Sequence, residues 1–173
     1  MGAPFNVYVP GENMKTRAFA VKASDHLEAT WALKDFDKET YHLQVYGPNG
    51  FYREFKGSAA DPAIGVECIY EKSKLKPDKL NGNIQFVFTN TSNKPYQLLI
   101  TDHVYKSAAV KKLLPAAGGN PLKIVVPMNL SAQHGWYDFS VTFLGVDGFE
   151  KRYAGKVETG EAGYSDPYMG RTV

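Results

Sequence analysis

Apolar and polar residues alternate in short runs along most of this 173-residue chain. The alternation is clearest in residues 41–46 and 136–143, and a period of two is the pattern of a β-strand with one buried face. Residues 106–114 fit either a helical turn or a strand. The pattern predicts strands at residues 5–9, 17–21, 28–33, 41–46, 51–55, 66–70, 83–89, 96–101, 122–126, 136–143 and 149–153.

Turn residues separate these runs at short intervals. Gly47-Pro48-Asn49-Gly50 divides two alternating segments, and a turn containing Asn-Gly between such segments strongly indicates a hairpin. Aromatic residues make up 13% of the chain and fit pleated, half-buried surfaces, so the composition agrees with the pattern. Many short strands with frequent turns predict an antiparallel sandwich or barrel.

The two halves of the chain resemble each other, which indicates an internal repeat. Residues 50–57 and 148–155 share the pattern Gly-Phe-x-basic-x-aromatic-x-Gly. Three pairs of segments match: 41–45 with 137–141, 51–57 with 149–155, and 4–9 with 95–100.

The match fails at the front of the first half. In the second half, two predicted strands (66–70 and 83–89) precede Pro95. Only three residues precede the matching Pro4, so we expect the chain to begin inside a domain. The expected fold is all-β, with two Ig-like antiparallel β-sandwich modules in tandem. Residues 1–60 form the first module, which lacks its first two strands, and residues 61–173 form the second. Because an unpaired sheet edge is unfavourable, we expect it to be covered by the second module, by another chain or by disorder.

Charge and cysteine content narrow the function classes. The net charge is only +2 and the basic residues are dispersed, so we expect no nucleic-acid partner. The one local basic run, Lys72–Lys76, is interpreted as a solvated turn between strands. Cys68 lies in an apolar run and is predicted to be a core thiol. No run reaches the ~20 apolar residues of a membrane span, and the sequence shows no signal-peptide pattern.

Catalytic and metal-binding chemistry has little support in the sequence. The four histidines are not spaced as a metal-binding pair, and the neighbours Asp102 and His103 would point to opposite faces of a strand. The sequence lacks a nucleophile elbow and a phosphate-binding glycine loop. We therefore expect no catalytic residue, no metal site and no cofactor in this chain.

The repeated strands contain the candidate binding residues. Arg53, Lys56, Lys151 and Arg152 are expected to point toward solvent or the partner strand. Together with Tyr52, they could contact phospholipid headgroups, because basic and tyrosine side chains favour a membrane interface. The alternative interpretation is architectural: the aromatic residues of the motif fill a core, and its glycines permit turns.

Ordered motifs along the chain also resemble a known family. These motifs are Tyr46–Gly57, Trp136–Val141, Phe149–Gly160 and the terminal Ser165-Asp166-Pro167-Tyr168-Met169-Gly170. They resemble the tandem C-terminal modules of secreted bacterial phosphocholine-preferring phospholipases C, and the resemblance covers nearly the whole chain.

The resemblance implies an accessory role. In that family a large N-terminal phosphoesterase domain contains the metal and the nucleophile, and no segment of this chain matches it. A parent enzyme that hydrolyses phosphatidylcholine or sphingomyelin is implied, with a secreted or periplasmic location. The implied partners are the phosphoesterase domain and a phospholipid surface. The alternatives are a purely structural or export scaffold, a carbohydrate-binding β-sandwich that uses Trp31 or Trp136, and a hydrolase in its own right.

Overall fold

The computed structural model describes residues 2–11 and 15–168, which form strands joined by loops and three 3-10 turns. Met169 and Gly170 of the terminal motif lie outside the described residues. The 3-10 turns are η1 (Leu33–Asp35), η2 (Asp37–Glu39) and η3 (Ser131–Gln133). The strands are β1 (Ala3–Val9), β2 (Lys15–Val21), β3 (Thr40–Tyr46), β4 (Tyr52–Ser58), β5 (Ile64–Lys72), β6 (Leu80–Asn90), β7 (Tyr96–Asp102), β8 (Val110–Leu114), β9 (Leu122–Met128), β10 (Trp136–Phe143) and β11 (Glu150–Lys156).

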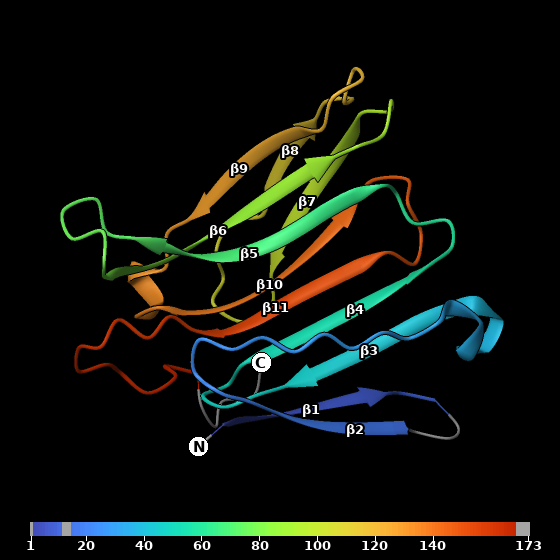
Figure 1. Cartoon of the computed structure of the whole chain (residues 1–173). Helices are drawn as coiled ribbons and strands as arrows, with labels where there is room; N and C mark the ends of the chain where they lie inside the picture. Colours follow the sequence, from blue (N-terminus) through green and yellow to red (C-terminus); the bar gives the residue numbers. More distant parts are fainter. Residues whose placement is uncertain (1, 12–14, 169–173) are drawn as a thin grey trace.

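The strands form two antiparallel sheets (Figure 1). One has eight strands in the order β2-β1-β3-β4-β11-β10-β7-β8, and the other has three in the order β5-β6-β9. The predicted all-β, sandwich-like class of antiparallel sheets is confirmed. The Ig-like detail and the module boundary after residue 60 stay predictions.

The order of the eight-stranded sheet is symmetric about its centre. From the centre outward, β4, β3, β1 and β2 lie on one side, and β11, β10, β7 and β8 lie on the other. The matched sequence segments fall on β4 and β11, on β3 and β10, and on β1 and β7. Glu54 faces Arg152 across the central pair, and these two residues are also matched positions of the repeat. The sheet therefore has a local two-fold pseudosymmetry through this pair.

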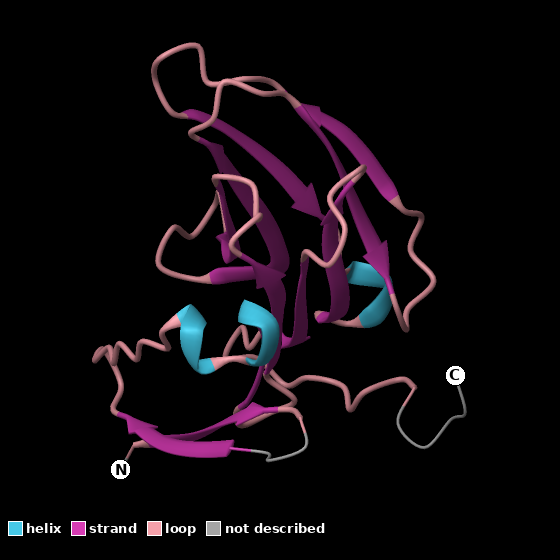
Figure 2. Ribbon diagram, turned by 90° about the vertical axis from the view of Figure 1, so that its right-hand side faces the viewer, coloured by secondary structure: helices cyan, strands magenta, loops and turns pink. Residues whose placement is uncertain are grey.

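The three-stranded sheet covers only the second half of the large sheet (Figure 2). Its Phe86 ring lies 5.4 Å from that of Tyr153 on β11 and 6.2 Å from that of Phe139 on β10. The continuous core cluster consists of residues from position 64 onward. Among the described residues, Val7 is the only buried hydrophobic residue that precedes position 61. The first half of the large sheet is therefore a single layer.

One predicted strand is wrong and one ambiguous segment is settled. Residues 28–33 were expected to form a strand, but residues 26–32 are irregular and η1 begins at Leu33. The corresponding segment of the second half, β9, pairs only with β6. In the described first half no strand takes the place of β6, so this segment has no partner for a ladder. In the ambiguous range 106–114, Val110–Leu114 is strand β8.

Candidate functional site

The five predicted contact residues lie on two faces of the large sheet. Successive side chains of a strand point to opposite faces, and directly paired residues share a face. Arg152 pairs with Glu54, so the even-numbered positions of β4 and β11 share the outer face, away from the three-stranded sheet. Tyr52, Lys56 and Arg152 therefore lie on this outer face, whereas Arg53 and Lys151 lie on the inner face.

The charges on the outer face are already paired. Arg152 donates from Nε and Nη2 to the two oxygens of Asp138, at 2.7 and 2.6 Å. This hydrogen bonding raises the pKa of Arg152. Lys56 Nζ lies 3.2 Å from Glu150 Oε2 and 3.3 Å from Glu54 Oε1. A phosphate that approached this face would compete with three carboxylates.

Glu54 is at the centre of this network. His42 Nε2 and Gln44 Nε2 donate to Glu54 Oε1 at 2.6 and 3.2 Å. Burial alone would raise the pKa of Glu54, but these hydrogen bonds and the charge of Lys56 outweigh it and lower that pKa to about 2. Glu54 is therefore a carboxylate at neutral pH, and it adds a negative charge to the centre of the outer face.

The Arg53 guanidinium lies inside the protein, and the residue is 9% exposed. Its Nη1 donates to the carbonyl oxygens of Tyr52 and Ala154, each at 2.8 Å. Its Nη2 donates to the hydroxyl of Tyr137 at 3.0 Å, and its Cζ lies 4.2 Å from the centroid of the Phe51 ring. Arg53 would have to leave all three acceptors to reach a phosphate group.

Lys151 shares the inner face with Arg53. Burial lowers the pKa of the Lys151 amine, although the nearby Asp61 carboxylate opposes this shift. Its Nζ lies 5.5 Å from the centroid of the Phe149 ring. The phospholipid contacts assigned to the five residues stay predictions. The five residues do not form one surface, because three lie on the outer face and two on the inner face.

The loop between β5 and β6 is a basic feature that the sequence interpretation treated only as a solvated turn. Leu75 at its tip is 93% exposed. Ser73 Oγ accepts hydrogen bonds from the backbone N–H groups of Leu75 and Lys76, both at 3.3 Å, which holds the turn. We call residues 72–79 the lysine tip, because they include Lys72, Lys74, Lys76 and Lys79. A leucine between lysines in a hairpin turn was the available sequence signal.

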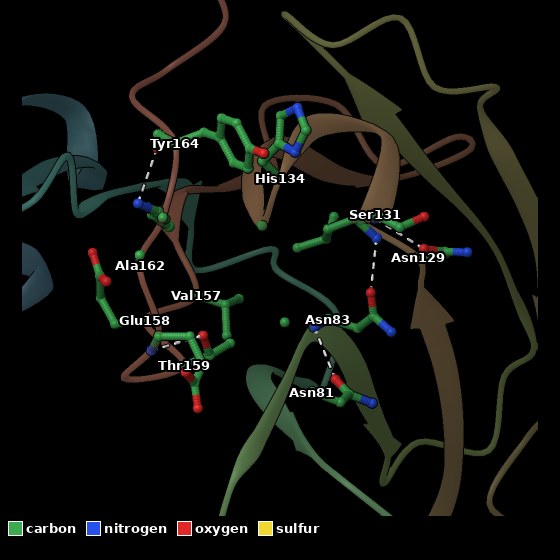
Figure 3. Close-up of a pocket in the computed structure, with 16 residues that line it drawn as sticks. Asn81, Asn83, Asn129, Ser131, His134, Val157, Glu158, Thr159, Ala162 and Tyr164 are labelled. Carbon is green, nitrogen blue, oxygen red and sulfur yellow. Dashed lines mark hydrogen bonds between the residues drawn. The ribbon is translucent and has the colours of Figure 1, made fainter.

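A polar pocket of about 340 Å³ lies next to the lysine tip, between the start of β6, η3 and residues 157–164 (Figure 3). Lys79 of the tip pairs with Glu161 of the pocket at 3.1 Å. The rings of His134 and Tyr164 stack with centroids 4.1 Å apart. The Tyr164 carbonyl accepts hydrogen bonds from Trp136 Nε1 at 3.1 Å and from Lys156 Nζ at 3.0 Å. Other polar side chains of the lining are Asn81, Asn83, Asn129, Ser131, Glu158 and Thr159.

The pocket offers hydrogen bonds to a small polar group. Its amides and hydroxyls supply both donors and acceptors, and Lys156 and Glu158 supply charges of opposite sign. Within residues 2–11 and 15–168, no group of three or more His, Cys, Asp or Glu side chains is placed to hold a metal ion. Cys68 packs against the core, as expected, and burial raises the pKa of its thiol to about 11. No helix in the described part of the chain is long and apolar enough to cross a membrane.

Comparison with known proteins gives consistent matches. The family described as "Bacterial phospholipase C, C-terminal domain" matches residues 1–58 and 65–156. The non-hemolytic phospholipase C of Burkholderia pseudomallei is 36% identical over 174 residues, which cover 97% of this chain and 23% of the relative. The non-hemolytic and hemolytic phospholipases C of Pseudomonas aeruginosa are 33% and 30% identical; each alignment covers 75% of this chain, and they cover 18% and 17% of the two relatives.

The chain spans about a fifth of the length of these relatives. The family match extends over most of the chain and includes both copies of the repeated hairpin motif. The chain therefore belongs to the family of bacterial phospholipase C C-terminal domains.

Proposed function

We propose that the chain is a non-catalytic accessory region of a bacterial phospholipase C, which packs on the phosphoesterase part of that enzyme and helps it dock at phospholipid surfaces. In this proposal the parent enzyme acts outside the cytoplasm on phosphatidylcholine or sphingomyelin. The printed names of the relatives support the link to phospholipase C. The small share of each relative that is matched supports an accessory role.

The exposed Leu75 within the lysine tip is the observation that supports docking most directly. Moving a leucine side chain from water into apolar surroundings is worth about 2 kcal/mol. Each lysine close to an anionic membrane surface adds about 1 kcal/mol, and salt screens this term. Among the described residues, Lys72, Lys74 and Lys76 have no carboxylate partner, so their charges are available.

Vesicle co-sedimentation tests this proposal. The chain is mixed with phosphatidylcholine vesicles, with and without phosphatidylserine, at low and at physiological salt. We expect stronger binding to the anionic vesicles at low salt, and a loss of about tenfold or more for Leu75→Glu, since ~1.4 kcal/mol is tenfold in affinity. Leu144→Glu is the matched control, because Leu144 is 76% exposed in the β10–β11 loop at the opposite end of the strands and should bind normally.

The outer-face residues are tested in the same assay. Lys56→Gln removes a cation from the outer face and leaves the lysine tip unchanged. Normal sedimentation of Lys56→Gln beside weak sedimentation of Leu75→Glu assigns the contact to the tip, and the reverse result assigns it to the repeated hairpins. No binding of the folded wild type to either vesicle contradicts the docking part and favours a structural or export scaffold.

Deletion of the region from a relative tests the accessory part. We expect that deletion of the region aligned with this chain from the Burkholderia pseudomallei relative reduces its secretion or lowers its melting temperature. The enzyme that still folds should keep its turnover of a soluble phosphocholine ester. Loss of that turnover in a stably folded enzyme would contradict the non-catalytic role.

A further inference from the structure

The inner face of the first half contains an open apolar groove of about 490 Å³. It lies on β1, β2, β3 and β4, with part of residues 22–32 along its side. The principal apolar side chains of the groove are Phe5, Val7, Val45, Phe51, Phe55 and Trp31. Leu27, which also lines the groove, is about half exposed.

Several positions that match these residues are fully covered in the second half. Val45 is half-buried, whereas its counterpart Val141 is 0% exposed. Phe55 is half-buried, whereas its counterpart Tyr153 is 5% exposed. The cover in the second half is the sheet of β5, β6 and β9, and β6 contributes the fully buried Phe86 to it. The second half of the repeat thus shows what the groove lacks, which is a covering sheet.

The segment at the side of the groove also lacks a partner. Residues 22–32 take the place in the chain order that β9 takes in the second half, between the second and third strands of the repeat. Figure 1 shows this light-blue segment running across β3 and β4. Among the described residues, positions 27–31 make no backbone–backbone hydrogen bonds. Their N–H and C=O groups are therefore available to an added strand.

We propose that the groove binds a pair of antiparallel β-strands from the rest of a phospholipase C chain. Their alternate apolar side chains fill the groove, and the nearer strand pairs with residues 26–32, which then become a strand like β9. Strand addition to a backbone with unpaired groups is a common mode of recognition. The relatives have the necessary length, since about four-fifths of each lies outside the matched region. This choice of partner rests on the proposed function, in which the chain is attached to that enzyme.

A chimera provides the first test. A second copy of residues 63–94, placed directly before Pro4, imitates the partner, because Pro4 matches Pro95 of the repeat. Hydrogen exchange of the amides of residues 27–31 is the readout. We expect exchange to slow at least tenfold in the chimera. The control chimera bears F86D and F88D in the added copy only, and it should exchange as fast as the unextended chain.

The full-length Burkholderia pseudomallei relative provides a test that does not depend on the chimera. The peptide aligned with residues 27–31 should be protected in the whole enzyme and exposed in the isolated aligned region. Equally fast exchange of this peptide in the whole enzyme and in the isolated region overturns the proposal. Fast exchange of residues 27–31 in the chimera also overturns it, if the amides of the added copy are themselves protected. If protection of residues 27–31 in the isolated chain rises with its concentration, the partner is a second copy of the chain, and the proposal is also overturned. None of these readouts involves vesicles, so failure here and failure of membrane docking are distinguishable.

Discussion

Neighbouring residues on β4 face two different environments. Arg53 points inward and satisfies its donors with two carbonyl oxygens and a tyrosine hydroxyl. Glu54 points outward and accepts hydrogen bonds from His42 and Gln44. A buried charge is tolerated only when it has such partners. The sequence motif shows that both residues are charged, but it does not show which acceptors the neighbouring strands bring to them.

Acid stability is expected to depend on Glu54. The pKa of this carboxyl is lowered from its ordinary 4.5 to about 2 in the folded state. The folded state therefore gains stability from Glu54 above about pH 4.5, and this gain is lost as the pH falls toward 2. Glu54→Gln should be less stable than the wild type at neutral pH, but it should lose less stability on acidification.

Urea unfolding at neutral pH and at several pH values between about 4.5 and 2 measures this difference. Asp147→Asn, in the exposed β10–β11 loop, is the matched control for removal of a carboxylate. Identical losses of unfolding free energy on acidification in Glu54→Gln and the wild type would show that another group controls the acid transition.

Most strands could be predicted from alternation, and the failures have physical causes. Residues 136–143 alternate cleanly because their apolar side chains pack in the core, whereas Asp138 and Ser140 lie on the opposite face, and the segment forms β10 over the same range. Residues 28–33 have an apolar pattern too, but a strand also needs a partner, and sequence alternation does not report one. The polar pocket was not predicted, since residues near positions 81, 130 and 160 come together only in the folded chain. The exposure of Leu75 likewise depends on the length of the β5–β6 loop.

The turn after β6 provides a prediction at the scale of one element. Asn90 is fully buried, and its Nδ2 donates to the carbonyl oxygens of Lys94 and Pro115, both at 2.8 Å. Its Oδ1 accepts hydrogen bonds from the N–H and the hydroxyl of Ser92. Asn90→Ala removes these four hydrogen bonds, each worth about 1 kcal/mol, and should lower the free energy of unfolding by about 3 kcal/mol in total.

Urea unfolding measures this loss, with Asn93→Ala in the exposed part of the same turn as the control. The control should change the free energy of unfolding by less than about 0.5 kcal/mol. A loss for Asn90→Ala as small as that of the control would mean that its hydrogen bonds do not hold the turn.

At the scale of the whole molecule, one sheet supports two different degrees of burial. Its second half is covered by a further sheet and contains the continuous core, whereas its first half is a single layer with an open groove. Apolar side chains at matched positions of the repeat, such as Val45 and Val141, therefore have similar chemistry but unequal packing. The stability of the isolated chain should come mainly from the second half.

The matched pair Val45 and Val141 tests this asymmetry. Val141→Ala creates a cavity in the covered core and should cost about 2 kcal/mol. Val45→Ala removes the same atoms from the open groove and should cost less than about 1 kcal/mol, since the side chain is already partly in contact with water. Denaturant unfolding of both variants measures the ratio. Equal costs would show that the first half is as well packed as the second.

The pair at the centre of the large sheet has a consequence for how such a molecule can diversify. In a dimer of identical subunits, a two-fold axis through a strand pair sets the residue on the axis against its own copy, so a glutamate at that position would meet a glutamate. Here the two copies are in one chain and can mutate independently. Glu54 and Arg152 occupy the matched positions with opposite charges, and they face each other across the central strand pair. Joining duplicated units in one polypeptide thus permits complementary charges at a position where a symmetric dimer would have repulsion.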